Sequence, residues 1–466
     1  MRNWKQALSA ARQGESKYKT LVQAIIADID QGVLKDGQRL APQRQVSEVL
    51  GISLQTVTNA YKELERQGRV RCEVGRGSFV SGRTSEKVAI SMLDRGEQSM
   101  LDFSTARIVH STEHDRLWQA TCAELALESD QPWMRAFRPI AGFESHRAAA
   151  VQWLLGLGMN VMPEDLLITN GASQGLFLAL ASLAGPDDVV LCAGLSEHSV
   201  IGTSQVLGFT LKGLEMDGEG INPEHFEDLC SNERITALVC TPNLNNPNSC
   251  LMSDTRRREI AEIARRFGVY IIEDDVYGPL LAGINKALPI SYYVPELSFY
   301  CTSMTKSVLS GLRVGFLVMP RRLALRTESI LRVNSWMAPP LLGEIAARWI
   351  TGGMAQELVQ LQRHLIARRQ AMVTHELGEF LIRNHPCSLS AWLSVPERWE
   401  AEGLMRELRR KQIALTLPDP FVAPGRPKPR AVRLCVGAEC TEEEMAQGLR
   451  TIHETFLQYP KVNEFF

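Results

Sequence analysis

The sequence of 466 residues has no long apolar segment and no closely spaced pair of cysteines. Every apolar run is broken well before the roughly 18 residues that a membrane span requires. The first residues, MRNWKQALSAARQGESKYK, contain no apolar stretch typical of a signal peptide. The ten cysteines are scattered without a C-x-x-C pair, which indicates free thiols in a reducing compartment and argues against a zinc site. We therefore expect a cytoplasmic protein without a metal site.

The composition is that of an ordinary globular protein. Hydrophobic residues make up 45% and charged residues 22% of the chain, which excludes a disordered, collagen-like or disulfide-dominated class. At roughly 100–200 residues per domain, the length predicts two to four domains.

Positive charge is concentrated in the N-terminal part of the chain. Residues 1–83 contain 14 Lys and Arg against 8 Asp and Glu, a net charge of +6. The remainder contains 37 against 45, a net charge of −8, and the two parts together give −2. A basic segment joined to an acidic body is typical of a nucleic-acid-binding module fused to another domain. A charge of +6 also arises by chance, so this interpretation needs a motif.

The first 80 residues have the pattern of a small helical domain followed by a hairpin. Apolar residues at helical spacing predict helices over 18–31, 42–51 and 54–68, with Ser53 as the N-cap of the third. The segments 69–74 and 78–82, joined by a Gly-Arg-Gly turn, predict two strands. This order indicates a winged helix-turn-helix, whose third helix enters the major groove of DNA.

Polar and basic residues of this module are candidates for DNA contact. The third helix presents its outer face to the bases, and the wing reaches the backbone or the minor groove. The permanently charged, planar guanidinium of arginine suits phosphate. The predicted contact residues are Arg44, Thr56, Thr58, Asn59, Lys62 and Arg76. Each basic residue alone is more often an ordinary surface charge, so the prediction depends on the combined pattern.

The same segment resembles the GntR family of bacterial transcriptional regulators. The family signature is L-P-S-x-R-x-L-A-x-x-L-G-V-S-R-x-T-V-x-x-A-Y-x-x-L-x-x-x-G, followed by a G-x-G-x-x-V wing. This chain has LAPQRQVSEVLGISLQTVTNAYKELERQG and GRGSFV. Leu54 stands where the family has an arginine after the turn serine. The resemblance therefore implies DNA binding but carries over no operator preference.

Beyond residue 100 the pattern is that of an α/β protein. Residues 84–100 are polar with little periodicity and predict a linker. Short β-branched segments then alternate with helices such as 253–268, which predicts a mostly parallel sheet covered on both faces. The candidate strands are 165–169, 188–192, 236–240, 269–274 and 298–303. From about residue 350, helices 355–378, 399–412 and 441–457 and strands within 389–395 and 431–437 predict a smaller α+β lobe. The predicted domains are 1–83 and 101–466.

Two motifs follow predicted strands in the second half of the body. TSMTKS (302–307) and GLRVGF (311–316) place Lys306 among hydroxyls with an arginine seven residues on, which suits a Schiff-base lysine beside a phosphate. In EDDVY, Asp274 ends an apolar strand, where a buried carboxylate needs a cation such as a protonated pyridine nitrogen. Tyr277 would reach the phenolic oxygen of such a ring. The alternative is that Asp274 caps the next helix.

Two further motifs predict polar groups at neighbouring strand ends. TPNLNNPNS (241–249) predicts a turn that projects the Asn246 amide into a crevice, unless it is an ordinary Asn-Pro turn. TNGASQG (169–175) predicts an anion site at a helix N-terminus. Each motif alone is a weak signal, because similar turns are common.

In this order and spacing, the four motifs closely resemble the fold-type I aminotransferases that use pyridoxal 5′-phosphate (PLP). The resemblance covers about residues 100–460. It implies Lys306 as the Schiff-base lysine, Asp274 at the pyridine nitrogen, and Asn246 with Tyr277 at the phenolic oxygen. The implied phosphate ligands are Gly171, Ala172, Ser173, Ser303 and Arg313. For the carboxylate of an amino acid it implies Arg433, with Arg430 as an alternative.

A GntR-like head on an aminotransferase-like body resembles the MocR subfamily of transcriptional regulators. This resemblance implies a head-to-tail homodimer that binds a double-stranded DNA operator and senses an amino acid or amine in the PLP pocket. Two alternatives stay open: an aminotransferase that retains a DNA-binding arm, and a regulator whose body no longer binds PLP.

The body departs from the family pattern where an aromatic residue usually stacks on the PLP ring. The usual E-x-P-x-Y segment is LCAGLSEHSV (191–200) here, with Ser196 expected at the aromatic position and His198 as the nearest ring. Phe137 stands where a phosphate-contacting tyrosine is usual, and NPNS replaces N-P-T-G. The residues implied to hold PLP are present, whereas those that usually stack on its ring or contact its phosphate from outside differ. We therefore expect bound PLP without efficient transamination, or an altered ligand site.

Overall fold

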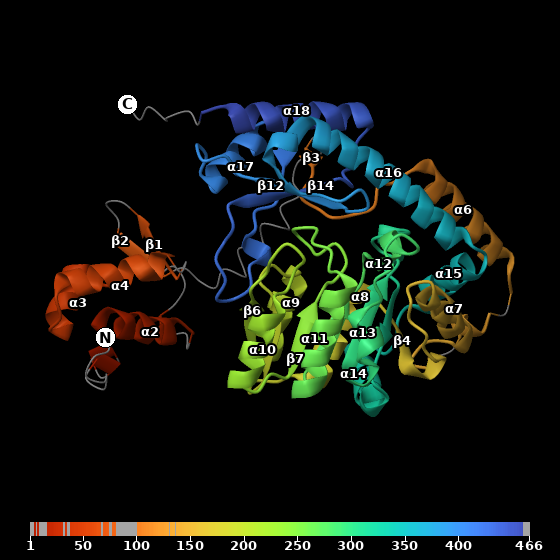
Figure 1. The fold of residues 1–466 in the computed structure, drawn as a ribbon, viewed down its shortest axis with the longest axis horizontal. Coiled ribbons are helices and arrows are strands. Elements are labelled where there is room, and N and C mark those ends of the chain that lie inside the picture. Colours follow the sequence, from red (N-terminus) through yellow and green to blue (C-terminus); the bar gives the residue numbers. More distant parts are fainter. Residues whose placement is uncertain are drawn as a thin grey trace. The chain divides into compact units, whose positions relative to one another are not determined.

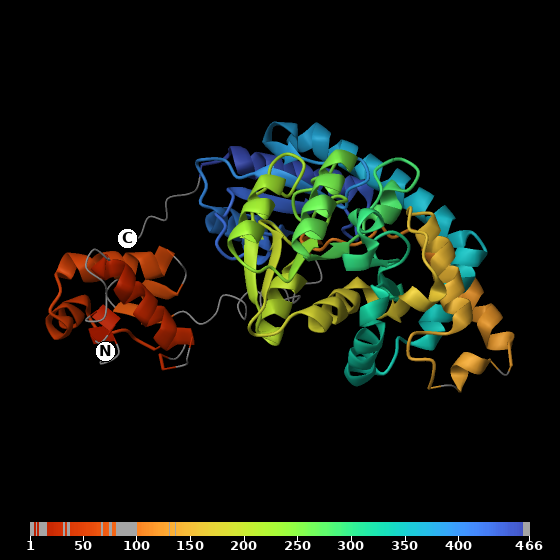
Figure 2. The same cartoon turned by 60° about the horizontal axis from the view of Figure 1, so that its bottom comes forward.

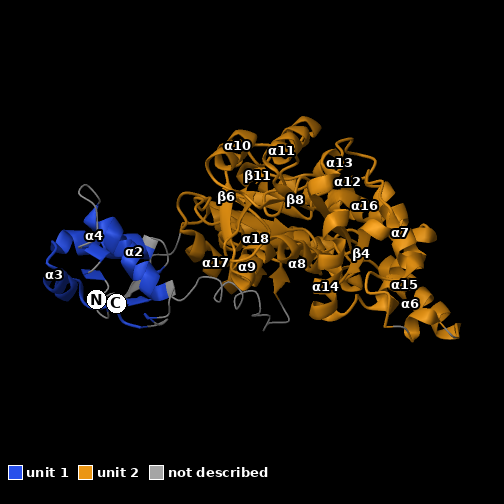
Figure 3. Cartoon of the chain, turned by 90° about the horizontal axis from the view of Figure 1, so that it is seen from below, with its two compact units in different colours: residues 1–96 blue, residues 97–466 orange. Residues whose placement is uncertain are grey.

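The chain divides into two compact units, Met1–Gly96 and Glu97–Phe466 (Figure 3). The computed structural model describes residues 4–5, 7–8, 16–30, 33–34, 38–66, 69–73, 77–80, 100–129, 131–135 and 137–459. Arg76 and residues 84–99 of the predicted linker lie outside the described residues.

The N-terminal unit is a winged helix-turn-helix, as the sequence predicts. Its helices are α2 (Lys17–Asp30), α3 (Gln43–Leu50) and α4 (Leu54–Arg66), and β1 (Val70–Glu73) pairs antiparallel with β2 (Gly77–Val80) (Figure 1). Helix α3 ends at Gly51, whose φ of 67° is readily adopted only by glycine. Ser53 Oγ accepts a hydrogen bond of 3.1 Å from the Thr56 N–H, which confirms the predicted N-cap of α4.

One apolar core holds the three helices of this unit together. The residues predicted to face inward on α4, Val57, Ala60, Tyr61 and Leu64, are all buried and pack with α2. Tyr61 also donates a hydrogen bond to the Ala41 carbonyl at 2.8 Å. Trp4 also belongs to this core, which was not predicted, and its Nε1 donates to Asp28 at 2.6 Å.

The C-terminal unit is built on a mostly parallel sheet. Its strands are β4 (Leu166–Thr169), β5 (Val189–Ala193), β6 (Thr210–Leu214), β7 (Ala237–Cys240), β8 (Tyr270–Asp274), β9 (Ser298–Ser303) and β10 (Gly315–Val318). Their order across the sheet is β4-β10-β9-β8-β7-β5-β6, and β10 runs antiparallel to both its neighbours. The five predicted strands are confirmed, whereas β6 and β10 were not predicted.

Helices cover both faces of this sheet (Figures 1 and 2). Along β5 and β7, successive side chains belong alternately to two different apolar clusters, because neighbouring residues of a strand point to opposite faces. Helix α8 (Gly171–Leu183) packs on one face, and α11 (Asp254–Phe267) and α13 (Ile290–Tyr293) pack on the other. The other helices before the small lobe are α6 (Thr112–Leu127), α7 (Glu144–Leu155), α9 (His198–Leu207), α10 (Pro223–Asn232), α12 (Gly278–Leu281), α14 (Ala324–Ser335) and α15 (Pro340–Thr351).

A smaller lobe follows the long helix α16 (Met354–Leu377) (Figure 1). It contains an antiparallel sheet of β11 (Leu381–Arg383), β12 (Ser390–Ser394) and β14 (Ala431–Cys435), with helices α17 (Ala401–Arg410) and α18 (Glu442–Leu457). The segment that follows the predicted linker also belongs here, because β3 (Leu101–Asp102) pairs parallel with β13 (Ile413–Ala414). Among the described helices, none is long and apolar enough to cross a bilayer.

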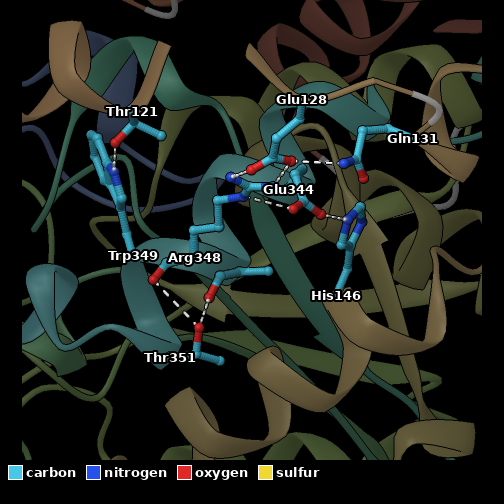
Figure 4. A network of polar contacts seen from close by, with 9 residues as sticks. Thr121, Glu128, Gln131, His146, Glu344, Arg348, Trp349 and Thr351 are labelled. Atoms are coloured by element: carbon cyan, nitrogen blue, oxygen red, sulfur yellow. Dashed lines mark hydrogen bonds and ion pairs between the residues drawn. The ribbon is translucent and has the colours of Figure 1, made fainter. Parts of the chain in front are cut away.

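A polar network joins the end of α6 to α7 and α15 (Figure 4). Arg348 on α15 donates to both carboxylate oxygens of Glu128 at 2.6 Å and to Glu344 at 2.7 Å. Glu344 also contacts His146 Nε2 on α7 at 2.9 Å. Since α7 packs against β4, this network supports the strand that leads to the turn at Gly171.

Gly315 provides a test of how tightly β10 packs against the start of α8. A Cβ at this position would lie 2.6 Å from the Gly171 carbonyl carbon and 2.7 Å from Thr169 Oγ1. Gly315→Ala is therefore expected to lower the free energy of unfolding by about 1–3 kcal/mol, the usual range for overpacking. Gly311→Ala is the matched control, because no atom lies within 4 Å of its added carbon. Denaturant unfolding compares the two, and equal stabilities would contradict this packing.

Candidate functional site

The polar residues singled out in the body converge at one edge of the large sheet. Asp274 ends β8, Lys306 follows β9, Gly171 follows β4 and Asn246 follows β7. Parallel strands bring their carboxyl ends to the same edge, where ligands of α/β proteins bind. The small lobe contributes Arg433 from β14, which hydrogen-bonds to Asn246. The site therefore lies where the two lobes meet.

Asp274 has a buried carboxyl oxygen to which no described residue donates a hydrogen bond. Its side chain is 5% exposed, and Oδ1 has no hydrogen-bond partner among the described residues. Burial, with the negative charges of Glu197 and Asp275, raises the pKa of Asp274 to about 8. A buried carboxylate is costly without a partner, so this oxygen fits a cationic N–H group such as a pyridinium. Tyr277 is at the N-cap position of α12, which argues against the helix-capping alternative for Asp274.

The neighbouring carboxylate of Asp275 is hydrogen-bonded within the protein. Asp275 accepts hydrogen bonds from Tyr300 Oη at 2.5 Å and from Asn243 Nδ2 at 2.7 Å. The fully buried Arg257 donates to Asn243 Oδ1 at 2.7 Å. This relay satisfies Asp275 and leaves Asp274 as the carboxyl group that faces the site.

Lys306 is a partly buried amine directly after β9. Its Nζ donates a hydrogen bond to the Ala106 carbonyl at 2.5 Å. Burial lowers the pKa of Lys306, and the negative charge of Glu197 opposes this shift. A lowered pKa increases the neutral fraction of the amine, which is the nucleophilic form that a Schiff base requires.

The turn after β4 and the loop before β10 form an anion cradle. Gly171, Ala172 and Ser173 make the first turn of α8, and Gly171 has a φ of 71°. A Cβ on Gly171 would lie 3.1 Å from the guanidinium of Arg313, which itself has an unusual φ of 50°. A helix N-terminus beside a guanidinium favours phosphate.

Buried hydroxyls line the strand end next to this cradle. Ser303, at the end of β9, is buried. The hydroxyls of Thr305 and Ser307 are buried and lack a hydrogen-bond partner among the described residues. Unsatisfied buried hydroxyls need a partner, so the segment that carries Lys306 has unused donors for an acceptor group. The residues at this sheet edge therefore fit the cofactor that the family resemblance implies.

Arg433 is buried, and its guanidinium forms no salt bridge with a carboxylate among the described residues. It is 5% exposed and donates to Asn246 Oδ1 at 2.7 Å and to the Ser104 carbonyl at 2.5 Å, while its Nε is unpaired among the described residues. The Phe421 ring lies 4.6 Å from the guanidinium carbon. An arginine in this state is suited to an incoming carboxylate. Tyr277 is buried in the same site, and burial raises its pKa well above the usual value.

The structure adds an acidic residue that the sequence analysis did not select. Glu197 stands at the N-cap position of α9, after β5, where its side chain makes no capping hydrogen bond. Its Oε2 instead accepts a hydrogen bond of 2.5 Å from Asn246 Nδ2. Ser196, expected at the aromatic position, is buried, and its backbone N–H donates to the Phe421 carbonyl at 2.8 Å. The strand-end rule that selected Asp274 and Asn246 would have found Glu197 if it had been applied to β5.

Glu197 forms an ion pair with His198, whose side chain is exposed. His198 Nδ1 lies 2.5 Å from Glu197 Oε1. Burial would raise the pKa of Glu197, but the hydrogen bond and charge of His198, with the charges of Lys306 and Arg433, lower it to about 2. The carboxylate in turn raises the pKa of His198. The pocket therefore holds a permanent negative charge beside its cations.

Two residues considered in the sequence analysis lie away from this site within the chain. Phe137 is 78% exposed, and its carbonyl accepts a hydrogen bond from Trp336 Nε1 at 2.6 Å. Arg430 donates to backbone carbonyls of the 395–399 segment. The structure thus favours Arg433 over Arg430 as a ligand arginine.

The predicted DNA-contact residues of the N-terminal unit differ in exposure and in their hydrogen bonds within the unit. Arg44, Asn59 and Lys62 are exposed, and Asn59 accepts a hydrogen bond from Gln55 at 2.9 Å. The Thr58 hydroxyl donates to Gln43 on α3 at 2.8 Å, so it is engaged within the fold. The Thr56 hydroxyl pairs with that of Ser53. Arg44, Asn59 and Lys62 therefore present the more accessible polar groups.

Comparison with known proteins identifies both units. Residues 100–452 match the family described as aminotransferase class I and II, and residues 17–80 match the gntR family of bacterial regulatory proteins. YdeF, an uncharacterized HTH-type transcriptional regulator of Bacillus subtilis, is 27% identical over 453 residues, 96% of this chain and 95% of that protein. The probable rhizopine catabolism regulatory protein MocR of Rhizobium meliloti is 24% identical over 414 residues, 82% and 79% of the two chains.

A solved structure supports the fold assignment of the body. LysN, the α-aminoadipate aminotransferase of Thermus thermophilus, was crystallised in complex with N-(5′-phosphopyridoxyl)-L-leucine. It superposes with a TM-score of 0.70 at 20% identity, covering 85% of this chain and 98% of that chain. The predicted α/β fold of the aminotransferase type is therefore confirmed.

The raised pKa of Asp274 predicts a pH-dependent stability of the cofactor-free protein. The carboxyl ionises at about pH 3.8 in the unfolded chain and at about 8 in the folded one, so stability falls as the pH rises between these values. Asp274→Asn removes this loss and should be more stable than the wild type at pH 8, by at least about 1.4 kcal/mol, the equivalent of one pKa unit. Unfolding between pH 5 and 8 measures the difference. The exposed Asp187→Asn is the control; parallel profiles for all three proteins would contradict the assignment.

Proposed function

Because the chain belongs to the class I and II aminotransferase family and carries a gntR-type head, we propose that it is a PLP-dependent transcriptional regulator. In this proposal the head binds an operator in double-stranded DNA, and the body binds an amino acid or amine as effector. The protein works as a homodimer in the cytoplasm. The observation that carries the proposal is a DNA-binding module on the same chain as a site that contains three functional groups. Among the described residues, these are the unpaired Oδ1 of Asp274, the partly buried amine of Lys306, and a buried Arg433 guanidinium that has no carboxylate partner and an unpaired Nε.

In this proposal, different residues of the site would bind different parts of the cofactor. Lys306 would hold PLP covalently, Asp274 would pair with its ring nitrogen, and Asn246 with Tyr277 would flank the phenolic oxygen. The phosphate would be bound by Gly171, Ala172, Ser173, Ser303 and Arg313. When bound, PLP attaches the amino group of an amino acid covalently and stabilises negative charge on the adjacent carbon.

The segment between the predicted linker and α6 connects this site to the head. Arg433 Nη2 and Thr416 Oγ1 both donate to the Ser104 carbonyl, and Lys306 donates to the Ala106 carbonyl. An effector carboxylate on Arg433 and a cofactor on Lys306 would compete for these donors. A ligand shifts an equilibrium only through its different affinity for two states. The two states would differ in whether residues 104–106 are held by Arg433 and Lys306. These residues follow closely in sequence after the predicted linker to the head.

An aminotransferase that retains a DNA-binding arm is a second candidate. The observation in its favour is that Lys306, Asp274, Tyr277 and Arg433 come together in one site. The absence of an aromatic residue at the ring-stacking segment 191–200 argues against efficient turnover. Formation of keto acids from a panel of amino acids by the purified protein distinguishes this candidate from a regulator.

Lys306→Ala tests whether the site is a cofactor site that controls DNA binding. The variant should lose the visible absorbance of bound PLP and any response of DNA binding to amino acids, because the covalent anchor is gone. Its fold and its basal operator affinity should be retained. Absorbance spectra and DNA titrations with and without amino acids measure these effects, with the exposed Lys286→Ala as control. An unchanged visible spectrum in Lys306→Ala would disprove the assignment.

Arg44→Ala tests the DNA-binding role of the head. If Arg44 contacts a phosphate, its loss should weaken binding to different sequences about equally and reduce the slope of log K against log salt by about one. Operator titrations at several salt concentrations measure the slope. Arg326→Ala, at an exposed arginine of the body, is the control. Equal slopes for both variants would remove Arg44 from the interface.

A further inference from the structure

Glu197 is a carboxylate with unused hydrogen-bonding capacity inside the ligand site. One oxygen is paired with His198 and the other accepts from Asn246, each at 2.5 Å. Among the described residues, no Lys or Arg nitrogen lies within 4.0 Å of this carboxylate. Each carboxylate oxygen has two acceptor positions, so two positions stay free. Within 4.0 Å and among the described residues, the one ion-pair partner of Glu197 is therefore His198, which is not permanently charged.

The position of Glu197 is set by contacts between the lobes. The Ser196 N–H donates to the Phe421 carbonyl at 2.8 Å, and Leu195 forms an isolated β-bridge with Val422. The Phe421 ring in turn lies over the Arg433 guanidinium. These contacts hold the 195–197 segment against the small-lobe side of the site, so Glu197 is positioned by the backbone as well as by its own hydrogen bonds.

A single amide side chain separates Glu197 from the ligand arginine. Asn246 donates to Glu197 through Nδ2 and accepts from Arg433 through Oδ1 at 2.7 Å. The site therefore presents a fixed cation and a fixed anion on the two sides of Asn246. Arg433 is suited to a carboxylate, and Glu197 is suited to a second, positively charged group of the same ligand. A ligand with an acidic side chain would place like charges together in a poorly solvated site.

We propose that Glu197 determines ligand specificity, so that the site prefers an amino acid whose side chain ends in a cationic group over one whose side chain is neutral or acidic. This inference rests on the proposed function, because it takes Arg433 as the site of the α-carboxylate. A purely structural role would be different: Glu197 would cap α9, where the helix dipole also favours a carboxylate, and would only orient Asn246. In that case its charge would not affect the order in which ligands bind.

Three amino acids of similar length separate these possibilities. L-lysine, L-norleucine and L-2-aminoadipate differ in the charge of the side-chain end, which is positive, neutral and negative. Binding to the PLP-loaded protein is followed as a change in visible absorbance, and Kd is measured for each. Wild-type protein should bind lysine about tenfold or more tightly than norleucine, the size expected for a charge-assisted hydrogen bond. It should bind 2-aminoadipate most weakly.

Glu197→Gln keeps the shape of the side chain and removes its charge. The variant should bind lysine and norleucine with similar Kd and should bind 2-aminoadipate better than the wild type does. Glu224→Gln, at an exposed residue of α10, should keep the wild-type order. An unchanged order in Glu197→Gln, a wild type that prefers 2-aminoadipate, or a wild type that binds none of the three would overturn the inference.

The visible spectrum of the protein before ligand is added distinguishes a failure of this inference from a failure of the proposed function. If the Lys306-dependent absorbance is present and the order of ligands is not the expected one, only the role of Glu197 is wrong. If that absorbance is absent, the proposed cofactor site fails, and the inference about Glu197 fails with it.

Discussion

Burial of three consecutive carboxyl groups at the end of β8 is the constraint on which the C-terminal unit depends. Glu273, Asp274 and Asp275 are each at most 5% exposed, and a buried carboxyl group without partners is costly. Glu273 is satisfied by the N–H groups of Ile290 and Ser291 at the start of α13. Asp275 is satisfied by Tyr300 and by the Asn243–Arg257 relay. These partners fix β7, β9, α11 and α13 around β8, and they leave one oxygen of Asp274 for a ligand.

The charge balance of the site explains why it spans both lobes. Lys306 and Asp274 come from the large lobe, whereas Arg433 comes from the small lobe and reaches Asn246 across the junction. The guanidinium of Arg433 and the amine of Lys306 donate to the backbone carbonyls of residues 104 and 106. Glu197 adds the negative charge that offsets these cations. Any ligand that changes the partners of Arg433 or Lys306 therefore also changes what holds the segment after the linker.

The spacing of apolar residues was sufficient to predict those helices and strands whose own segment carries a clear periodicity. The three helices and the hairpin of the head were predicted, because α4 presents Val57, Ala60, Tyr61 and Leu64 at helical spacing. In the body, β6 was missed because TLKGL contains a lysine and a glycine, and β10 was missed because its first residues belong to the GLRVGF motif. The pairing of β3 with β13 was not predictable, since it joins segments about 300 residues apart.

The sequence by itself determined the class of both units and the residues that end the buried strands. Polar side chains directly after apolar, β-branched segments are a local signal, and the sheet topology brings such residues to one edge. Only the tertiary structure decided how these groups are paired. Among the described residues, it showed that Asp275 is satisfied while one oxygen of Asp274 is unpaired. It also showed that Arg430 donates only to backbone carbonyls, that Arg433 keeps an unpaired Nε, and that Glu197 joins the site through Asn246. Burial and hydrogen-bond partners come from segments far apart in the chain, and no local pattern in the sequence encodes them.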